Sequence, residues 1–181
     1  MPTPRWLRTL PWLPAVAVSL LLQGCLPRFA ANSVGSAGSS GTAPLIHHSA
    51  SAAESDELRG QIVVNAISQS GKNYRYGGDG PEDFDCSGLV RFVYAQVGLT
   101  VPRTTLTLFN AGEPVAMRDV RPADLLFYRF DDSPGPPNHV MIFIGNGEAI
   151  HAPAGGKVVR SAKVDTPGFN RRFIGARRLM D

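Results

Sequence analysis

The sequence contains only two cysteines in 181 residues, which excludes a disulfide-rich scaffold. A single disulfide between Cys25 and Cys86 is the competing interpretation in an oxidising compartment. That bond would join an N-terminal leader to the start of a helix, so we favour a separate role for each cysteine. The short Cys and His spacings of common zinc sites are also missing.

The folded part of the chain lacks a net charge. The formal charge is +3, yet residues 54–181 carry fifteen basic and fifteen acidic side chains, so the excess lies near the N-terminus. We therefore predict no nucleic-acid partner, because such binding needs a basic patch on the folded part. A C-terminal cluster is interpreted as the solvated side of a strand, with binding of an anionic polymer as the alternative: Arg171, Arg172, Arg177 and Arg178.

The N-terminal apolar stretch, residues 10–22, is shorter than the roughly 20 residues that span a bilayer. It follows a basic start and is interrupted by prolines, so residues 1–24 are predicted to be a signal peptide. The run Leu22-Gln23-Gly24-Cys25 resembles a bacterial lipobox, in which Cys25 would carry the lipid; an ordinary cleaved signal is the alternative. We therefore expect a lipid-anchored protein of the cell envelope. Leu26 permits sorting to the outer membrane, facing the periplasm, where the organism has one.

Residues 25–55 are rich in Ser, Ala and Gly and show no periodicity, which predicts a flexible linker. Residues 56–181 are predicted to form one domain, without internal repeats and monomeric. Its first part has helical patterns: an apolar stripe from Leu58 to Ile67, a helix starting at Cys86, and a short helix over 104–110. Five β-type runs follow, at 125–130, 140–145, 148–151, 157–161 and 172–179. This order indicates the α+β class with an antiparallel sheet.

Cys86 lies at the start of an amphipathic segment. Asp85 is a good N-cap residue, so Cys86 is expected in the first turn of the helix. Backbone amides and the positive end of the helix dipole there would favour the thiolate. A small buried cysteine without chemistry is the alternative.

Two histidines supply what a cysteine nucleophile needs, which is a base and a polar group that orients it. His139 begins one predicted strand and His151 ends the next, with Gly145-Asn146-Gly147 between them. Only a register that pairs Ile142 with Ile150 puts both histidines on one face. We therefore predict a three-residue loop or an equivalent bulge. The alternatives are structural histidines or an open metal site of Cys86, His139 and His151.

Six segments together resemble the NlpC/P60-type bacterial cell-wall peptidases, a papain-like family of cysteine endopeptidases. They occur in the family's order: Tyr74-Arg75-Tyr76-Gly77-Gly78, Asp85-Cys86-Ser87-Gly88-Leu89-Val90, Pro102-Arg103-Thr104-Thr105, Pro122-Ala123-Asp124-Leu125, His139-Val140 and Ile150-His151-Ala152. The resemblance spans about residues 58–179 and implies N-terminal helices, with the nucleophile at a helix N-terminus, packed on an antiparallel sheet.

The resemblance also implies roles. Cys86 would attack the scissile carbonyl, His139 would be the base, and His151 would orient His139. Tyr76 would lie by the nucleophile, and Asp85 and Ser87 would contact the free amine of a peptide stem. For Tyr76 a buried structural ring is the alternative, and for Asp85 a capping role alone.

The implied substrate is the peptide stem of peptidoglycan, at the bond between γ-linked D-glutamate and diaminopimelate or at a D,D crosslink. Neither a metal nor an organic cofactor is expected. The chain departs from the family pattern at Ala123 and Met141, where glycine is common, and in the proline-rich loop 131–138. The rival functions are a related thiol amidase or acyltransferase, and an inactive wall-binding module.

Overall fold

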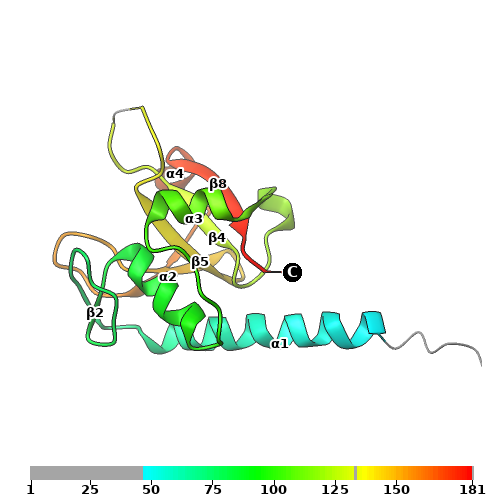
Figure 1. The fold of residues 1–181 in the computed structure, drawn as a ribbon. Helices are drawn as coiled ribbons and strands as arrows, with labels where there is room; N and C mark the ends of the chain where they lie inside the picture. The colour runs from blue at the N-terminus through cyan, green and yellow to red at the C-terminus, as the bar shows by residue number, and fades with distance from the viewer. Residues whose placement is uncertain (1–46, 133, 181) are drawn as a thin grey trace, which may run out of the picture. The chain divides into compact units, whose positions relative to one another are not determined.

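The computed structural model describes residues 47–132 and 134–180 (Figure 1). The helices are α1 (His47–Ser68), α2 (Cys86–Ala95), α3 (Thr105–Ala111) and α4 (Pro167–Asn170), with a 3-10 turn at Met117–Asp119. Two short parallel strands, β1 (Asn73–Tyr74) and β2 (Asp83–Phe84), precede α2. In the described part of the chain, no helix is long and apolar enough to cross a membrane.

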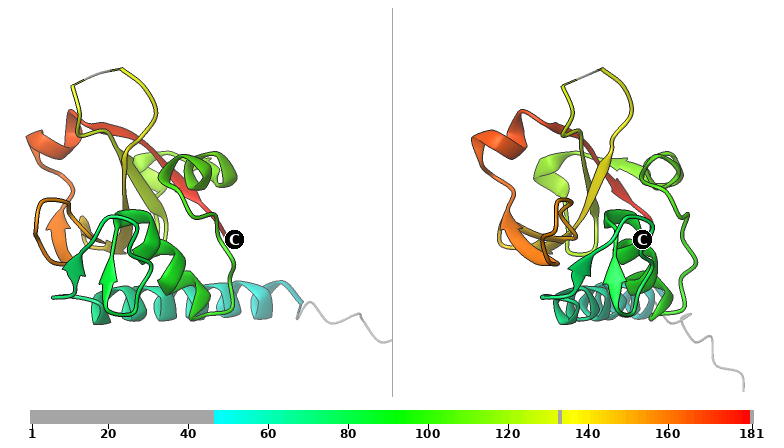
Figure 2. Two further views of the ribbon diagram at one scale, coloured as in Figure 1. Left: turned by 60° about the vertical axis from the view of Figure 1, so that its left-hand side comes forward. Right: turned by 90° about the vertical axis from the view of Figure 1, so that its left-hand side faces the viewer.

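The remaining strands form one antiparallel sheet in the order β3-β8-β4-β5-β6-β7. They are β3 (Glu113–Val115), β4 (Leu125–Tyr128), β5 (His139–Gly145), β6 (Glu148–His151), β7 (Arg160–Lys163) and β8 (Phe173–Arg178). Helix α2 packs against β5 and α1, and Figure 2 shows these two helices lying together beside the sheet. Helices followed by an antiparallel sheet confirm the predicted α+β class.

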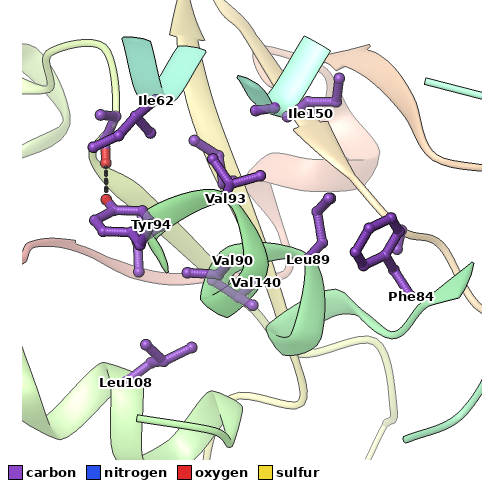
Figure 3. Packing of buried hydrophobic residues seen from close by; sticks show 14 of the residues in the cluster. Ile62, Phe84, Leu89, Val90, Val93, Tyr94, Leu108, Val140 and Ile150 are labelled. Carbon is purple, nitrogen blue, oxygen red and sulfur yellow. Dashed lines mark hydrogen bonds between the residues drawn. The ribbon is translucent and has the colours of Figure 1, made fainter. Parts of the chain in front are cut away.

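The main core lies between α1, α2 and the sheet. It is built from aliphatic and aromatic side chains of both halves, among them Ile62, Leu89, Val93, Val140 and Ile150 (Figure 3). Strand β4 is buried on both faces: Leu125 and Phe127 join this core, whereas Leu126 and Tyr128 join a second cluster across the sheet. The core therefore fixes the start of α2 against the start of β5.

Helix α1 extends further toward the N-terminus than the sequence pattern predicted. It begins at His47, so residues 47–55, predicted to be linker, are helical. The alanines and Glu54 in this segment are good helix formers, a preference that a composition-based linker assignment ignores. The predicted signal peptide, Cys25 and linker residues 25–46 lie outside the described residues.

One predicted strand is also misplaced. Residues 157–161 were predicted to form a strand, but the observed strand is Arg160–Lys163. Val158 instead bridges to Asn73, and the Val159 amide donates to the Lys72 carbonyl. The segment before β7 is therefore held by the loop that follows α1.

The β5–β6 hairpin has the predicted register, because Ile142 pairs with Ile150. The connection is a two-residue turn, Asn146-Gly147, with φ values of 51° and 70°, as in a type I′ turn. The register shifts between Phe143 and Gly145, so Ile144 forms a bulge. The structure thus uses the bulge rather than a three-residue loop, and both histidines lie on one face.

Candidate active site

Asp85 organises the start of α2. Its carboxylate accepts from the Gly88 amide at 2.6 Å, which makes Asp85 the predicted N-cap and Cys86 the first helical residue. It also accepts from the Gly77 amide at 3.0 Å and from the Ser87 hydroxyl at 3.2 Å. Burial alone would raise the pKa of Asp85, but the hydrogen bonds from Arg103 and Gly88 outweigh it and lower that pKa.

Arg103 is the site residue that sequence reasoning missed. Its guanidinium makes a two-point ion pair with Asp85 and also donates to Ser87 at 3.0 Å. The sequence did contain a signal, because Arg103 belongs to the Pro102-Arg103-Thr104-Thr105 segment, to which we had assigned no role.

The Cys86 thiol lies between α2, α3 and β5. Its sulfur is 3.6 Å from the Thr105 hydroxyl and is hydrogen-bonded by the Val140 amide. Burial raises the pKa of the thiol, and the Asp85 carboxylate adds to this, against the hydrogen bonds from Thr105 and Val140. In the free protein, burial therefore opposes the thiolate that the helix N-terminus was expected to favour.

The two predicted histidines are in contact. His139 Nε2 lies 2.8 Å from His151 Nδ1, and both rings are buried. Burial, and then the neighbouring His151, lowers the pKa of His139 to about 3. Burial, and then Arg160 and Lys157, lowers the pKa of His151 to about 4. Both rings are consequently neutral at physiological pH, as a general base must be before it accepts a proton.

Two clefts meet at Asn138. The thiol cleft, of about 420 Å³, is lined by Tyr74, Tyr76, Cys86, Ser87, Arg103 and Asn138 among others. The histidine cleft, of about 460 Å³, is lined by residues that include Asn138, His139, His151, Lys157, Arg160 and Phe169. Tyr76 shares a cleft with the thiol as predicted, but the residue is 88% exposed, which contradicts the buried-ring alternative.

The alternative of a metal site gains no geometric support. Among residues 47–132 and 134–180, no group of three or more His, Cys, Asp or Glu side chains could hold a metal ion. The arrangement instead offers a thiol, an imidazole pair and a helix N-terminus. A carbonyl carbon could be attacked there while its oxygen accepts from a backbone amide.

Residues 71–178 match the profile of the NlpC/P60 family. The chain belongs to this family. It is 37% identical over 110 residues to a probable endopeptidase of Mycobacterium tuberculosis, covering 61% of this chain and 27% of that one. It is 33% identical over 125 residues to the murein DD-endopeptidase MepH of Escherichia coli (66% and 46% covered). It is 32% identical over 129 residues to the gamma-DL-glutamyl hydrolase of Bacillus subtilis (70% and 31%). The matched region spans less than half the length of these NlpC/P60 relatives.

Solved structures of NlpC/P60 domains have the same fold. The P60 domain of an antigen from M. avium subspecies paratuberculosis has a TM-score of 0.61 and 30% identity, covering 71% of this chain and 98% of that domain. The peptidoglycan hydrolase RipB of Mycobacterium tuberculosis has a TM-score of 0.59 and 27% identity, with 71% and 68% covered. These similarities confirm the predicted papain-like fold and the resemblance inferred from the six segments.

Proposed function

We propose that this protein is a cysteine endopeptidase that hydrolyses peptide stems of peptidoglycan through Cys86, His139 and His151. The observation that carries the proposal is the 2.8 Å contact between His151 and His139, whose neighbour in β5, Val140, hydrogen-bonds the Cys86 sulfur through its amide. NlpC/P60 relatives named endopeptidases or peptidoglycan hydrolases support the same class of reaction.

The first step forms a thioester. His139 donates its Nε2 proton to His151 Nδ1 in a hydrogen bond, so its Nδ1 is free to accept the thiol proton. The sulfur attacks the scissile carbonyl carbon, and the Cys86 amide at the start of α2 stabilises the oxyanion. Since the resting thiol and imidazole are both neutral, proton transfer accompanies attack rather than preceding it. His139 then returns the proton to the leaving amine.

The second step releases the acyl half. His139 takes a proton from a water molecule, whose oxygen attacks the thioester carbonyl, and the proton returns to the sulfur as the carboxylic acid leaves. His151 holds the ring of His139 in one orientation during both steps. No metal or organic cofactor is needed for this chemistry.

We assign the scissile bond to the one between γ-linked D-glutamate and diaminopimelate. The B. subtilis relative, named a gamma-DL-glutamyl hydrolase, supports this choice. A D,D crosslink is the second candidate, because the E. coli relative is named a murein DD-endopeptidase. Tyr76, an exposed residue that lines the thiol cleft, is proposed to contact the stem.

Asp85 and Ser87 are proposed to face the free amine of the stem from the same cleft. The Asp85 carboxylate already accepts hydrogen bonds from Gly77, Gly88, Ser87 and Arg103. An approaching amine would therefore share this carboxylate with Arg103, and the capping role and the binding role hold together.

We further propose that Cys25 carries a lipid and anchors the protein in the cell envelope, at the outer membrane facing the periplasm if the organism has one. The lipobox-like run supports this, and one solved NlpC/P60 relative, from Staphylococcus aureus, is described as similar to a lipoprotein. Radiolabelled palmitate should be incorporated into the wild-type chain in cells and not into Cys25→Ala. Equal labelling of both would contradict this assignment.

The activity is tested by mass spectrometry of purified muropeptides incubated with the full chain carrying Cys25→Ala. Monomeric and crosslinked stems are supplied separately, so the product masses identify the bond. Cleavage that disappears in Cys86→Ala supports an endopeptidase; products from another bond would favour the amidase or acyltransferase. No cleavage by the folded protein would instead favour a wall-binding module.

A further inference from the structure

His151 has a buried nitrogen without a partner. Its Nδ1 faces His139. Its Nε2 is buried and has no hydrogen-bond partner among the described residues. The side chain is only 5% exposed, and it lines the histidine cleft. A buried polar atom of this kind is costly unless a ligand or water satisfies it.

The tautomer of the His139–His151 pair determines whether His151 Nε2 carries a proton. His139 can accept the thiol proton at Nδ1 only if its own proton is on Nε2, donated to His151 Nδ1. Neutral His151 then has its single proton on Nε2. The active tautomer therefore directs a buried N–H donor into the histidine cleft, and the matching ligand group is an oxygen acceptor.

Two positively charged side chains near His151 favour a negatively charged acceptor. Arg160 is the cross-strand partner of His151 in the β6–β7 pair, and Lys157 lines the same cleft. Both side chains are exposed, and neither forms an ion pair with another residue of the described chain. Arginine and an imidazole N–H together suit a carboxylate, which accepts at both oxygens.

The proposed mechanism places the histidine cleft on the leaving-group side of the reaction. His139 must hand its proton to the departing amine, so that half of the substrate passes over the histidines rather than over the start of α2. We propose that Lys157, Arg160 and His151 Nε2 form a subsite for a carboxylate on the leaving-group half of the substrate. This inference rests on the proposed function. It also states in which direction the peptide stem lies across the site, with its leaving-group half over the histidines.

Such a carboxylate would act on the rate as well as on binding. By accepting from His151 Nε2 it holds the tautomer in which His139 is a base. Its negative charge also favours the imidazolium that forms when the thiol loses its proton. Lys157 and Arg160 are therefore specificity-determining residues, and His151 is a positioning residue that connects them to His139.

A binding experiment tests the subsite without requiring turnover. The Cys86→Ala protein, labelled with ¹⁵N-histidine, is titrated with diaminopimelate and with its diamide, which has the same size but no carboxylate. We expect the acid to shift the His151 Nε2 signal and to bind at least about tenfold more tightly than the diamide. The Lys157→Gln/Arg160→Gln protein should lose this difference. The matched control, Arg118→Gln/Lys163→Gln, removes the same charge from exposed positions outside the cleft and should keep it. Equal binding of acid and diamide, or no shift of the Nε2 signal, would overturn the subsite.

A kinetic experiment separates this inference from the proposed function. The kcat/KM values of two stem peptides are compared. In one peptide the leaving residue carries carboxylates, and in the other it carries carboxamides. We expect the wild-type kcat/KM to favour the acid by at least about tenfold, with part of the effect in kcat, and the Lys157→Gln/Arg160→Gln ratio to approach one. An unchanged ratio in that variant would refute the subsite while leaving the peptidase intact. Carboxylate-dependent binding without any cleavage would refute the peptidase and leave the subsite.

Discussion

Arg103 and Asp85 form a two-point ion pair across the thiol cleft, with Nη1–Oδ1 and Nη2–Oδ2 distances of 3.0 and 2.7 Å. The pair joins the loop before α3 to the N-cap of the helix that carries Cys86. It therefore contributes both to stability and to the position of the thiol.

Loss of the two-point ion pair between Arg103 and Asp85 should destabilise the domain. Arg103→Gln is expected to lower the free energy of unfolding by about 1–3 kcal/mol, because Asp85 is then a largely buried carboxylate without its cation. Arg103→Lys should restore only part of the loss, since an ammonium cannot make both bonds at once. Urea denaturation measures the change. Arg91→Gln, which removes an exposed ion pair with Asp79, is the matched control and should cost less than about 1 kcal/mol. Equal losses in the two glutamine variants would contradict the special role of Arg103.

Gly88 allows α2 to approach the preceding loop. A methyl group at this position would collide with the Gly78 carbonyl, whose oxygen accepts from the Asp85 amide. Since neither backbone can move without breaking the N-cap, Gly88→Ala should destabilise the domain by more than about 3 kcal/mol or prevent folding. Gly60→Ala in α1 meets no atom within 4 Å and should be neutral or stabilising by up to about 1 kcal/mol. Thermal unfolding of both variants tests the contrast, and a mild effect at Gly88 would contradict the close approach.

Ala123 occupies a backbone conformation that glycine prefers, with φ of 71°. The sequence departs from the family's usual glycine here. Ala123→Gly should relieve steric strain worth about 1 kcal/mol, partly offset by the greater freedom of glycine in the unfolded chain. The net expectation is an unchanged or slightly higher melting temperature. A clear decrease would mean that burial of the Ala123 methyl group outweighs the strain.

Acid should destabilise the domain through the histidine pair. The pKa values of His139 and His151, about 3 and 4, lie below the ordinary 6.5, so the unfolded chain binds protons that the folded chain refuses. Stability is therefore fully present above pH 6.5 and decreases as the pH falls toward 4, by at most about 1.4 kcal/mol per pH unit for each histidine. Melting curves across this range measure the slope. His139→Gln/His151→Gln should flatten it, and an equally steep slope in that variant would assign the effect to other groups.

The Cys86 thiol should be a weak acid in the free protein. Because burial raises its pKa, alkylation by iodoacetamide should show its inflection at higher pH than a free cysteine peptide measured in parallel. Thr105→Val removes the hydroxyl 3.6 Å from the sulfur and should move the inflection higher still. An inflection below that of the peptide would mean that the helix N-terminus dominates over desolvation.

Local patterns predicted the parts of the site that depend on neighbouring residues. The N-cap at Asp85 and the pairing of Ile142 with Ile150 both follow from rules that operate over a few positions. The Arg103–Asp85 pair spans 18 residues and has no periodic signature, so the segment that contains Arg103 marks the residue but does not identify its partner.

The errors have the same origin. The burial that raises the pKa of the Cys86 thiol was not foreseen, because the helix terminus is visible in the sequence, whereas the packing around the sulfur is not. Likewise, the start of α1 was placed late because a Ser- and Ala-rich segment fits both a linker and a helix, and the sequence alone does not distinguish them. The predicted strand began too early, because residues 157–159 lie before β7 and Val158 instead bridges to Asn73, which is distant in the sequence.

The bulge at Ile144 determines which face of the β5–β6 hairpin each side chain of β6 lies on. One inserted or deleted residue in the Asn146-Gly147 turn would send His151 to the opposite face of the sheet and bring Ile150 into its place. A second single-residue change, or loss of the bulge, would restore the original order. Evolution and engineering can therefore change the length of this hairpin only in steps of two, unless a bulge is gained or lost in the same event.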